Sequence, residues 1–272
     1  MTGQPRFRAD LYRGTAADYD RFRLRYPPAL LDDLCQRLAV TGTGRLLDLA
    51  CGPGTITFDL CDRFDEVCAV DLEPDAIEFA AAKADALGVR NVQWSVGRAE
   101  DVELDAAFDL VTIGNAFHRL DRPRVADRAA DCLAPGGYLA VLWSSTPLHG
   151  PTPWQQELEH AVVDWMDRAG VQDRLPADLE EHLAQHPQVR VLEDAGFVVL
   201  GRHEFVEHHE WNADSLIGFM YSTSLLSRVA LGDRTAEFEH DVRRRLHDLD
   251  PSGVYTEEVS FAYDLARTPT GT

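Results

Sequence analysis

The sequence predicts an α/β fold: a mostly parallel sheet of seven strands with helices on both faces, antiparallel edge strands and a helical lid. Three observations support this class. Residues 46–143 alternate short apolar runs with helical patterns, which is typical of parallel strands joined by helices. Residues 144–187 break that alternation with an amphipathic helix, which we expect to form a lid. Residues 197–206 and 254–265 return to strand-like runs that would extend the sheet antiparallel.

The individual elements follow in order along the chain. Residues 27–40 should form an entry helix, because prolines suit a helix start and leucines repeat at helical spacing at Leu30, Leu31, Leu34 and Leu38. Five strands are expected at LLDLA, EVCAV, NVQWSV, FDLVTIG and GGYLAVLW, with a helix at about 55–64 after the first. Two helices lie between the late strands, one containing Leu216, Phe219, Met220 and Tyr221, the other Phe238, Val242 and Leu246.

Composition limits the class of protein. The 272 residues, 45% of them hydrophobic, suffice for a packed core. With 46 acidic residues against 26 basic ones, the formal charge of −20 repels polyphosphate, so we expect no nucleic-acid partner. The five cysteines include no CxxC pair, which indicates reduced thiols and no zinc site. No apolar run reaches the roughly 20 residues that span a bilayer, and no signal peptide is evident, so we expect a cytoplasmic protein without membrane contact.

A glycine-rich turn, DLACGPGT from Asp48 to Thr55, follows the first strand. Gly52 and Gly54 allow positive φ and a close approach of a ligand to the backbone. Asp71 lies 19 residues beyond Gly52, at the end of the second strand, where a carboxylate can accept hydrogen bonds from ribose hydroxyls. Alone, the turn could be a simple connection and the aspartate a helix cap. Together, at this spacing, they indicate a nucleoside-binding site.

The same turn argues against two other cofactor classes. A dinucleotide-binding fingerprint needs glycine or alanine three positions after Gly54, where this chain has Thr57. No GxxxxGK[ST] sequence supplies the lysine of a phosphate-binding loop. A nicotinamide-dependent oxidoreductase is therefore kept only as an alternative function, beside a noncatalytic cofactor-binding protein.

From Tyr12 to Trp143 the chain resembles the class I S-adenosylmethionine-dependent methyltransferases, specifically the small-molecule branch of UbiE-like, or type 11, domains with a Rossmann-like fold. Ordered motifs carry the resemblance. They are the glycine-rich motif with Asp48, Ala50, Gly52 and Gly54, the ribose-binding acid Asp71, the adenine loop at 97–101, the fourth strand and its continuation at 108–118, and the turn at 133–137.

The resemblance implies S-adenosylmethionine as the cofactor and S-adenosylhomocysteine as its product. Tyr19 would lie near the sulfonium and Arg23 at the cofactor carboxylate. Many relatives have aspartate at the position of Arg98, and because arginine cannot accept a hydrogen bond from the adenine amino group, Glu100 or backbone near Ala99 should make that contact. The cofactor-binding residues implied are Tyr19, Arg23, Asp48, Ala50, Cys51, Gly52, Gly54, Asp71, Leu72, Ala99, Glu100 and Asn115.

The protein is expected to be a monomer or a homodimer. Its chain is expected to divide into four parts. Residues 1–27 would cover the cofactor, and residues 28–143 would form the cofactor-binding core. Residues 144–187 would be the helical lid insertion. Residues 188–272 would complete the core and contribute further lid helices at about 212–248.

His118 is the candidate catalytic residue. It follows the fourth strand, at the expected mouth of the site, and histidine titrates in the range that suits a general base. A histidine that only shapes the pocket fits the same position. His203, His208 and His209 alternate with glutamates, but a solvated edge strand accounts for them, so we expect no metal site.

The expected reaction is in-line transfer of a methyl group to a small, aromatic or apolar acceptor. Secondary metabolism is one setting in which such acceptors occur. Lid residues could line an apolar acceptor pocket, although side chains at helical spacing also form ordinary cores. The residues concerned are Trp154, Trp165, Phe219, Met220 and Tyr221.

Overall fold

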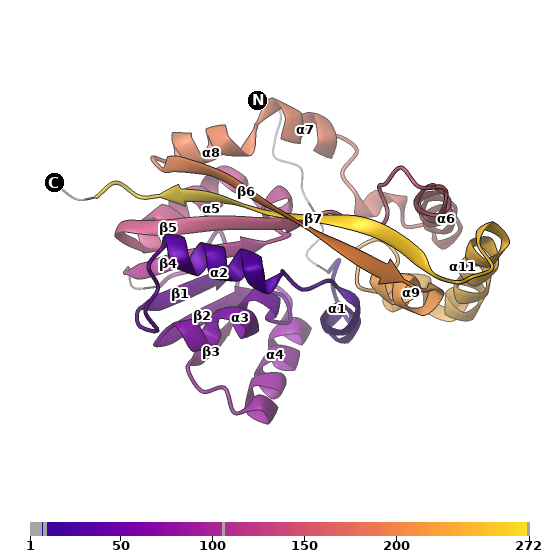
Figure 1. The fold of residues 1–272 in the computed structure, drawn as a ribbon, viewed down its shortest axis with the longest axis horizontal. Coiled ribbons are helices and arrows are strands. Elements are labelled where there is room, and N and C mark those ends of the chain that lie inside the picture. Colours follow the sequence, from indigo (N-terminus) through magenta and orange to yellow (C-terminus); the bar gives the residue numbers. More distant parts are fainter. Residues whose placement is uncertain (1–6, 8–9, 105–106, 271–272) are drawn as a thin grey trace.

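The computed structural model describes residue 7 and residues 10–104 and 107–270, and it has a single seven-stranded sheet (Figure 1). The strand order is β3-β2-β1-β4-β5-β7-β6. The bounds are β1 (Arg45–Leu49), β2 (Glu66–Asp71), β3 (Val92–Val96), β4 (Phe108–Gly114), β5 (Leu133–Ser144), β6 (Val198–Trp211) and β7 (Tyr255–Arg267). The first five strands are parallel, and β7 is antiparallel to both β5 and β6. The predicted fold class is confirmed.

The order of the strands reverses between β1 and β4, which are neighbours although two strands separate them in sequence. In an open parallel sheet, the ends of strands at such a reversal splay apart and leave a crevice at their carboxyl edge. Leu46, Leu47 and Leu49 of β1 are fully buried, as expected for a strand with helices on both sides. The sheet therefore offers a ligand site just beyond Leu49.

Helices cover both faces of the sheet. On one face lie α2 (Pro28–Arg37) and α3 (Thr55–Leu60), whose leucines pack with Leu46 and Leu110, and α4 (Pro74–Leu87), which packs on Ala69. On the other face lie α5 (Arg122–Cys132) and α8 (Gln188–Asp194), which pack with Leu47 and Val111. Two 3-10 helices, η1 (Cys61–Arg63) and η2 (Phe117–Arg119), follow α3 and β4.

The lid is a helical layer with a hydrophobic cluster of its own. Its helices are α6 (Pro153–Ala169), α9 (Ala213–Tyr221), α10 (Arg228–Leu231) and α11 (Thr235–Leu249), with 3-10 helices η3 (Gln172–Arg174) and η4 (Gly232–Arg234). Helix α7 (Leu179–Gln185) contributes no residue to this cluster and lies next to α8 (Figure 1). Trp165, Phe219 and Phe238 belong to this cluster. Trp211 and Tyr255, the paired ends of β6 and β7, belong to it too, so the long β6–β7 pair joins the core to the lid (Figure 1).

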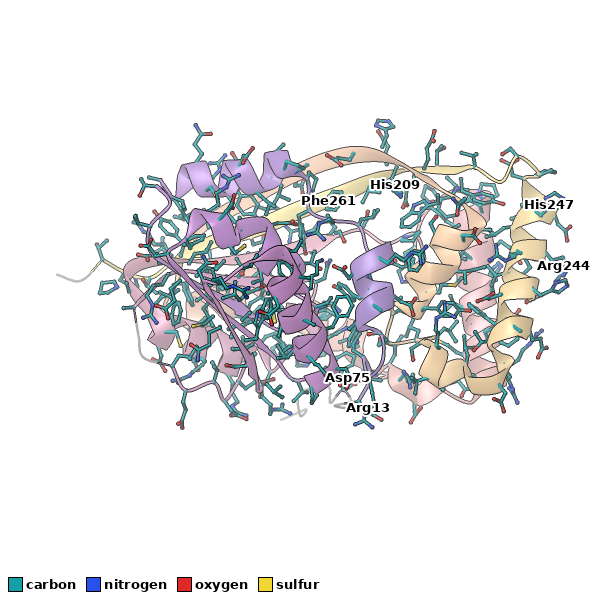
Figure 2. The ribbon with its side chains drawn as sticks, turned by 90° about the horizontal axis from the view of Figure 1, so that it is seen from below. Arg13, Asp75, His209, Arg244, His247 and Phe261 are labelled. Atoms are coloured by element: carbon teal, nitrogen blue, oxygen red, sulfur yellow. The ribbon has the colours of Figure 1, made fainter. Side chains whose placement is uncertain are left out.

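Helix α1 (Ala16–Phe22) lies between the core and the lid helices (Figure 2). On the core side, the backbone N–H of Gly14 donates to Asp75 at the start of α4, 3.1 Å away. On the lid side, a Cβ on Gly218 of α9 would lie only 2.4 Å from the Phe22 ring, so this close contact requires glycine. Within the described part of the chain, no helix has both the length and the apolarity needed to cross a membrane.

Candidate functional site

A cavity of about 630 Å³ opens at the carboxyl ends of the parallel strands. Its walls come from the N-terminal segment and from the ends of β1, β2, β3 and β4. Residues predicted to bind the cofactor and found in its lining are Tyr19, Ala50, Gly52, Asp71, Leu72, Ala99, Glu100 and Asn115. Segments spread over about a hundred residues of sequence thus converge on one cavity at the strand reversal.

The Asp71 carboxylate is held by backbone at the rim of this cavity. Its Oδ2 accepts from the N–H of Gly52 at 2.7 Å, and its Oδ1 accepts from the N–H of Glu73 at 2.9 Å. Burial raises the pKa of Asp71, and the backbone hydrogen bonds oppose that rise. Each carboxylate oxygen has two lone pairs, so both keep acceptor capacity for a ligand. The glycine turn and the strand-end acid therefore form one unit.

One apolar and one polar side chain also line this cavity. Leu72, which is 39% exposed, is the apolar one. Glu100 is buried and accepts from the backbone N–H of Asp121 at 3.1 Å. Arg98 forms an ion pair with Glu100 at 3.5 Å. Its positive charge compensates the negative charge of the Glu100 carboxylate. Such a lining suits a flat, polar-edged ring.

Gly54 lies outside the cavity lining. It has φ of 86° and precedes α3, and a Cβ there would lie 2.7 Å from the Trp94 ring. Its position is explained by packing of the turn against β3.

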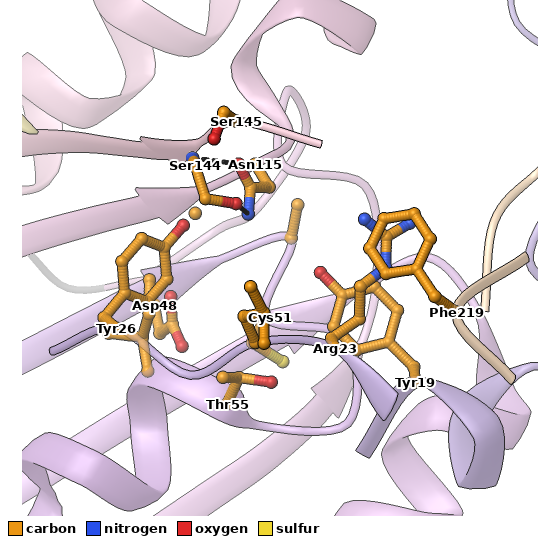
Figure 3. Close-up of a pocket in the computed structure, with 14 residues that line it drawn as sticks. Tyr19, Arg23, Tyr26, Asp48, Cys51, Thr55, Asn115, Ser144, Ser145 and Phe219 are labelled. Atoms are coloured by element: carbon orange, nitrogen blue, oxygen red, sulfur yellow. Dashed lines mark hydrogen bonds between the residues drawn. The ribbon is translucent and has the colours of Figure 1, made fainter. Parts of the chain in front are cut away.

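A second, much smaller cavity of about 30 Å³ adjoins the first (Figure 3). Both cavities are lined by Tyr19, Ala50, Gly114 and Asn115, so these residues mark their junction. The other polar or aromatic residues of the small cavity are Arg23, Tyr26, Asp48, Cys51, Thr55, Ser144, Ser145 and Phe219. Ala50 and Asn115 both have left-handed backbone, with φ of 54° and 51°, which is costly for alanine and marks the junction as a constrained point.

Asp48 lies at the base of the small cavity and is only 1% exposed. Its oxygens accept from the Thr57 hydroxyl at 2.6 Å and the Thr112 hydroxyl at 2.9 Å. Desolvation raises the pKa of Asp48 to about 6, although both hydroxyls oppose the rise. The same Thr57 that departs from a dinucleotide fingerprint is therefore the hydrogen-bond donor that keeps this carboxylate in place.

Asn115 and Ser144 form a clamp between the ends of β4 and β5. The Asn115 side chain donates to the Ser144 hydroxyl at 3.1 Å and accepts from the Ser144 backbone N–H at 2.9 Å (Figure 3). Sequence reasoning did not single out Ser144, Ser145 or Tyr26. Position at the end of a predicted strand could have indicated the serines, and Tyr26 lies in the N-terminal segment expected to cover the cofactor. Among the described residues its buried hydroxyl has no hydrogen-bond partner, and burial raises its pKa well above the ordinary value.

Arg23 connects the small cavity to the lid. Its guanidinium lies 5.0 Å from the centre of the Tyr19 ring and 4.5 Å from that of Phe219 (Figure 3). Its Nε donates to the Ser222 hydroxyl at 2.9 Å. Of the five lid residues considered for an acceptor pocket, Phe219 lines this cavity. The other four belong to the lid's hydrophobic layer: Trp154, Trp165, Met220 and Tyr221.

His118 lies in η2, beyond the end of β4, and is absent from the lining of both cavities. Its side chain keeps an exposed face, yet the surrounding protein lowers its pKa to about 4, chiefly by desolvation. Repulsion from Arg119, Arg122 and Arg23 contributes further. The imidazole is therefore neutral at pH 7 and able to accept a proton, although it is a weak base.

Comparison with known proteins agrees with this geometry. Residues 46–137 match the family model described as a methyltransferase domain. An uncharacterized methyltransferase of Mycobacterium bovis is 33% identical over 128 residues, which are 47% of this chain and 49% of that protein, so the chain spans about half the length of that relative. An uncharacterized methyltransferase of Schizosaccharomyces pombe is 24% identical over 265 residues, covering 95% of this chain and 97% of that protein.

Among solved structures, the YcgJ protein of Bacillus subtilis superposes with a TM-score of 0.55 at 16% identity. The superposition covers 89% of this chain and 99% of that chain. At this identity the likeness concerns the fold alone.

Proposed function

We propose that this chain, whose residues 46–137 match the family model of a methyltransferase domain, is a class I methyltransferase that transfers a methyl group from S-adenosylmethionine to a small organic acceptor. One observation carries the proposal. The glycine turn, the backbone-held Asp71, and Leu72 with Glu100 all face one cavity, and that cavity meets a second one at Asn115. Such a pair of joined spaces suits a cofactor and an acceptor that must react with each other.

The residues present fit S-adenosylmethionine. The cavity of about 630 Å³ lies within the usual range for small-molecule sites, roughly 300 to 1,000 Å³. Asp71 would accept from the ribose hydroxyls, and Leu72, Ala99 and Glu100 would hold the adenine. Arg23 would pair with the cofactor carboxylate. When bound, S-adenosylmethionine supplies an electrophilic methyl group on a sulfonium and leaves as S-adenosylhomocysteine.

The chain's own residues would act mainly by positioning. In-line displacement needs the acceptor atom about 3 to 3.5 Å from the methyl carbon, on the side opposite the sulfur. Tyr19, Asn115 and Gly114 lie where the two cavities meet, so they would set this alignment. The face of the Tyr19 ring suits a sulfonium. If the acceptor atom carries a proton, neutral His118 could take it, or could shape the mouth of the site.

The acceptor class follows from lining and charge. The aromatic side chains of Phe219, Tyr19 and Tyr26 favour an acceptor with an apolar or aromatic body, of which the small cavity, about 30 Å³, can hold only a part. Some relatives that match over 73 residues are named RNA methyltransferases. The formal charge of −20 opposes an RNA substrate for this chain, so we propose a small molecule.

Labelled methyl transfer tests the proposal. The protein is incubated with S-adenosylmethionine carrying a labelled methyl group, and with either a low-molecular-weight metabolite fraction or total RNA. Label in small molecules, lost in the Asp71→Ala variant, is the expected result. Label in RNA would overturn the acceptor class. Binding of NAD but not of S-adenosylmethionine, measured by calorimetry, would overturn the cofactor and the activity together.

A further inference from the structure

Among residues 10–104 and 107–270, three arginines near His118 have no carboxylate partner. Arg23 follows α1, Arg119 is in η2 beside His118, and Arg122 begins α5. All three exert an electrostatic effect on His118, so they act on one region. In the part of the chain that the structure describes, none of them lies within 4 Å of an aspartate or glutamate oxygen. We call His118 and these arginines the cationic cluster.

The lack of partners is not explained by a shortage of carboxylates. The chain has 46 acidic residues against 26 basic ones. Arginines elsewhere use them: Arg245 pairs with three carboxylates, and Arg202 pairs with Asp264 at 2.7 Å. A group of arginines left unpaired inside so acidic a protein therefore needs another explanation.

Burial makes the unpaired state costly. Arg122 is 4% exposed and desolvation lowers its pKa. Among the described residues, Nη2 of Arg122 and both Nε and Nη1 of Arg119 are buried without a hydrogen-bond partner. A buried charge without compensation destabilises the fold. Stacking of Arg119 over the Tyr12 ring, 5.2 Å from its centre, leaves the positive charge in place.

The cluster borders the proposed reaction site. Arg119 lines the large cavity and Arg23 lines the small one, whereas Arg122 lines neither and can act on a bound ligand only through its charge. Both also donate to the same lid segment after α9: Arg23 to the Ser222 hydroxyl at 2.9 Å, and Arg119 to the Ser224 hydroxyl at 3.0 Å. These bonds hold the lid segment over the cluster, which would enclose any ligand bound there.

The cofactor alone cannot supply the missing negative charge. S-adenosylmethionine carries one carboxylate but also a sulfonium and an ammonium, so its binding adds net positive charge. If its carboxylate pairs with Arg23, Arg119 and Arg122 still lack a counter-charge. The remaining molecule that must enter this site is the acceptor.

We propose that the acceptor is a small organic anion whose carboxylate or phosphate is held by Arg119 at the large cavity, with the buried charge of Arg122 adding attraction from outside the lining. The inference rests on the proposed function and narrows its substrate class. Planar guanidinium groups present paired N–H donors that match such oxyanions. An apolar or aromatic body attached to the anion would lie toward Phe219. The anionic group serves to bind the acceptor. The methyl group could be transferred to that anionic group or to another atom of the acceptor.

Calorimetry on protein saturated with S-adenosylhomocysteine tests the inference. The probes are benzoate, inorganic phosphate and the neutral benzamide, titrated into wild type, Arg119→Gln, Arg122→Gln and Arg244→Gln. Arg244 lies on the outer lid helix α11, where it pairs with Asp241 and Asp248, and serves as the matched control (Figure 2). Benzoate or phosphate should bind wild type and Arg244→Gln at least about tenfold more tightly than benzamide binds. Which anion binds better distinguishes a carboxylate from a phosphate.

Arg119→Gln should weaken anion binding by about tenfold or more, and Arg122→Gln, which removes a charge outside the lining, should weaken it less. Each variant is first titrated with S-adenosylhomocysteine, so that the anion is always added to saturated protein. Arg119→Lys, which keeps the charge, should restore part of the loss. If Arg122→Gln does not fold, the half-buried Arg119 carries the test. The inference is overturned if neither anion binds better than benzamide, or if Arg119→Gln binds the anion as wild type does. Failure of wild type to bind S-adenosylhomocysteine would instead overturn the proposed function.

Discussion

Asp48→Asn should make the ligand-free protein more stable at neutral and alkaline pH. The carboxylate is 1% exposed and accepts from the hydroxyls of Thr57 and Thr112. Asparagine has nearly the same shape, and both threonine hydroxyls can turn to accept or donate, so the hydrogen bonds can be kept. What the substitution removes is the cost of ionising a buried acid.

The size of the expected stabilisation follows from the shift in the pKa of Asp48. Desolvation raises the pKa of Asp48 from 3.8 to about 6. A tenfold change in proton affinity is worth about 1.4 kcal/mol, so ionisation of Asp48 costs the folded state about 3 kcal/mol. Between pH 4 and 6 the folded state keeps this proton while the unfolded chain has released it. The contribution of Asp48 to stability is therefore complete below pH 4 and is lost as pH rises through about 6.

Urea unfolding at several pH values between 4 and 8 measures this effect. The difference in unfolding free energy between Asp48→Asn and wild type should grow with pH in favour of the variant, by about 3 kcal/mol over this range. Asp62→Asn is the control, because that side chain is 79% exposed and should show little pH-dependent difference. A difference that stays constant with pH, or that turns against Asp48→Asn at pH 8, would refute the reasoning.

Three further outcomes are expected. Asp71→Ala should weaken S-adenosylmethionine binding by about tenfold or more. The substitution removes a charged hydrogen-bond acceptor and leaves the Gly52 N–H without its partner. Unchanged affinity by calorimetry would reject the role of Asp71 in binding the ribose. His118→Ala should lower turnover while sparing cofactor affinity. Because the pKa of His118 is about 4, the turnover rate of the wild type should not change through titration of this histidine between pH 5 and 8. A change in single-turnover rate centred near pH 6.5 would contradict this. Gly218→Ala should destabilise the protein by about 1 to 3 kcal/mol, because its Cβ would meet the Phe22 ring, and equal thermal stability of variant and wild type would exclude that contact.

Local sequence patterns determined the sheet and the wall of the large cavity that Gly52 and Asp71 form. The apolar runs from Leu46 to Trp143 have the spacing of parallel strands, and the structure confirms the fold class that they predict. The glycine turn and Asp71 are separated by 19 residues, and a hydrogen bond of 2.7 Å joins Gly52 to Asp71. Such features are readable because each strand ends at the same edge of a parallel sheet, so residues at successive strand ends meet without any further information.

Contacts between distant segments were decided only by the tertiary structure. Arg23 and Ser222 are 199 residues apart in sequence, and Asn115 and Ser144 are 29 apart. Helical periodicity in the lid could not tell a pocket wall from a core, and the structure assigns Phe219 to the cavity and Trp165 to the lid cluster. The physical reason is that burial and charge pairing depend on what packs against a residue. The sequence pattern indicates which face of a helix is apolar. Only the assembled fold, over the residues that the structure describes, decides that the three arginines near His118 lack carboxylate partners.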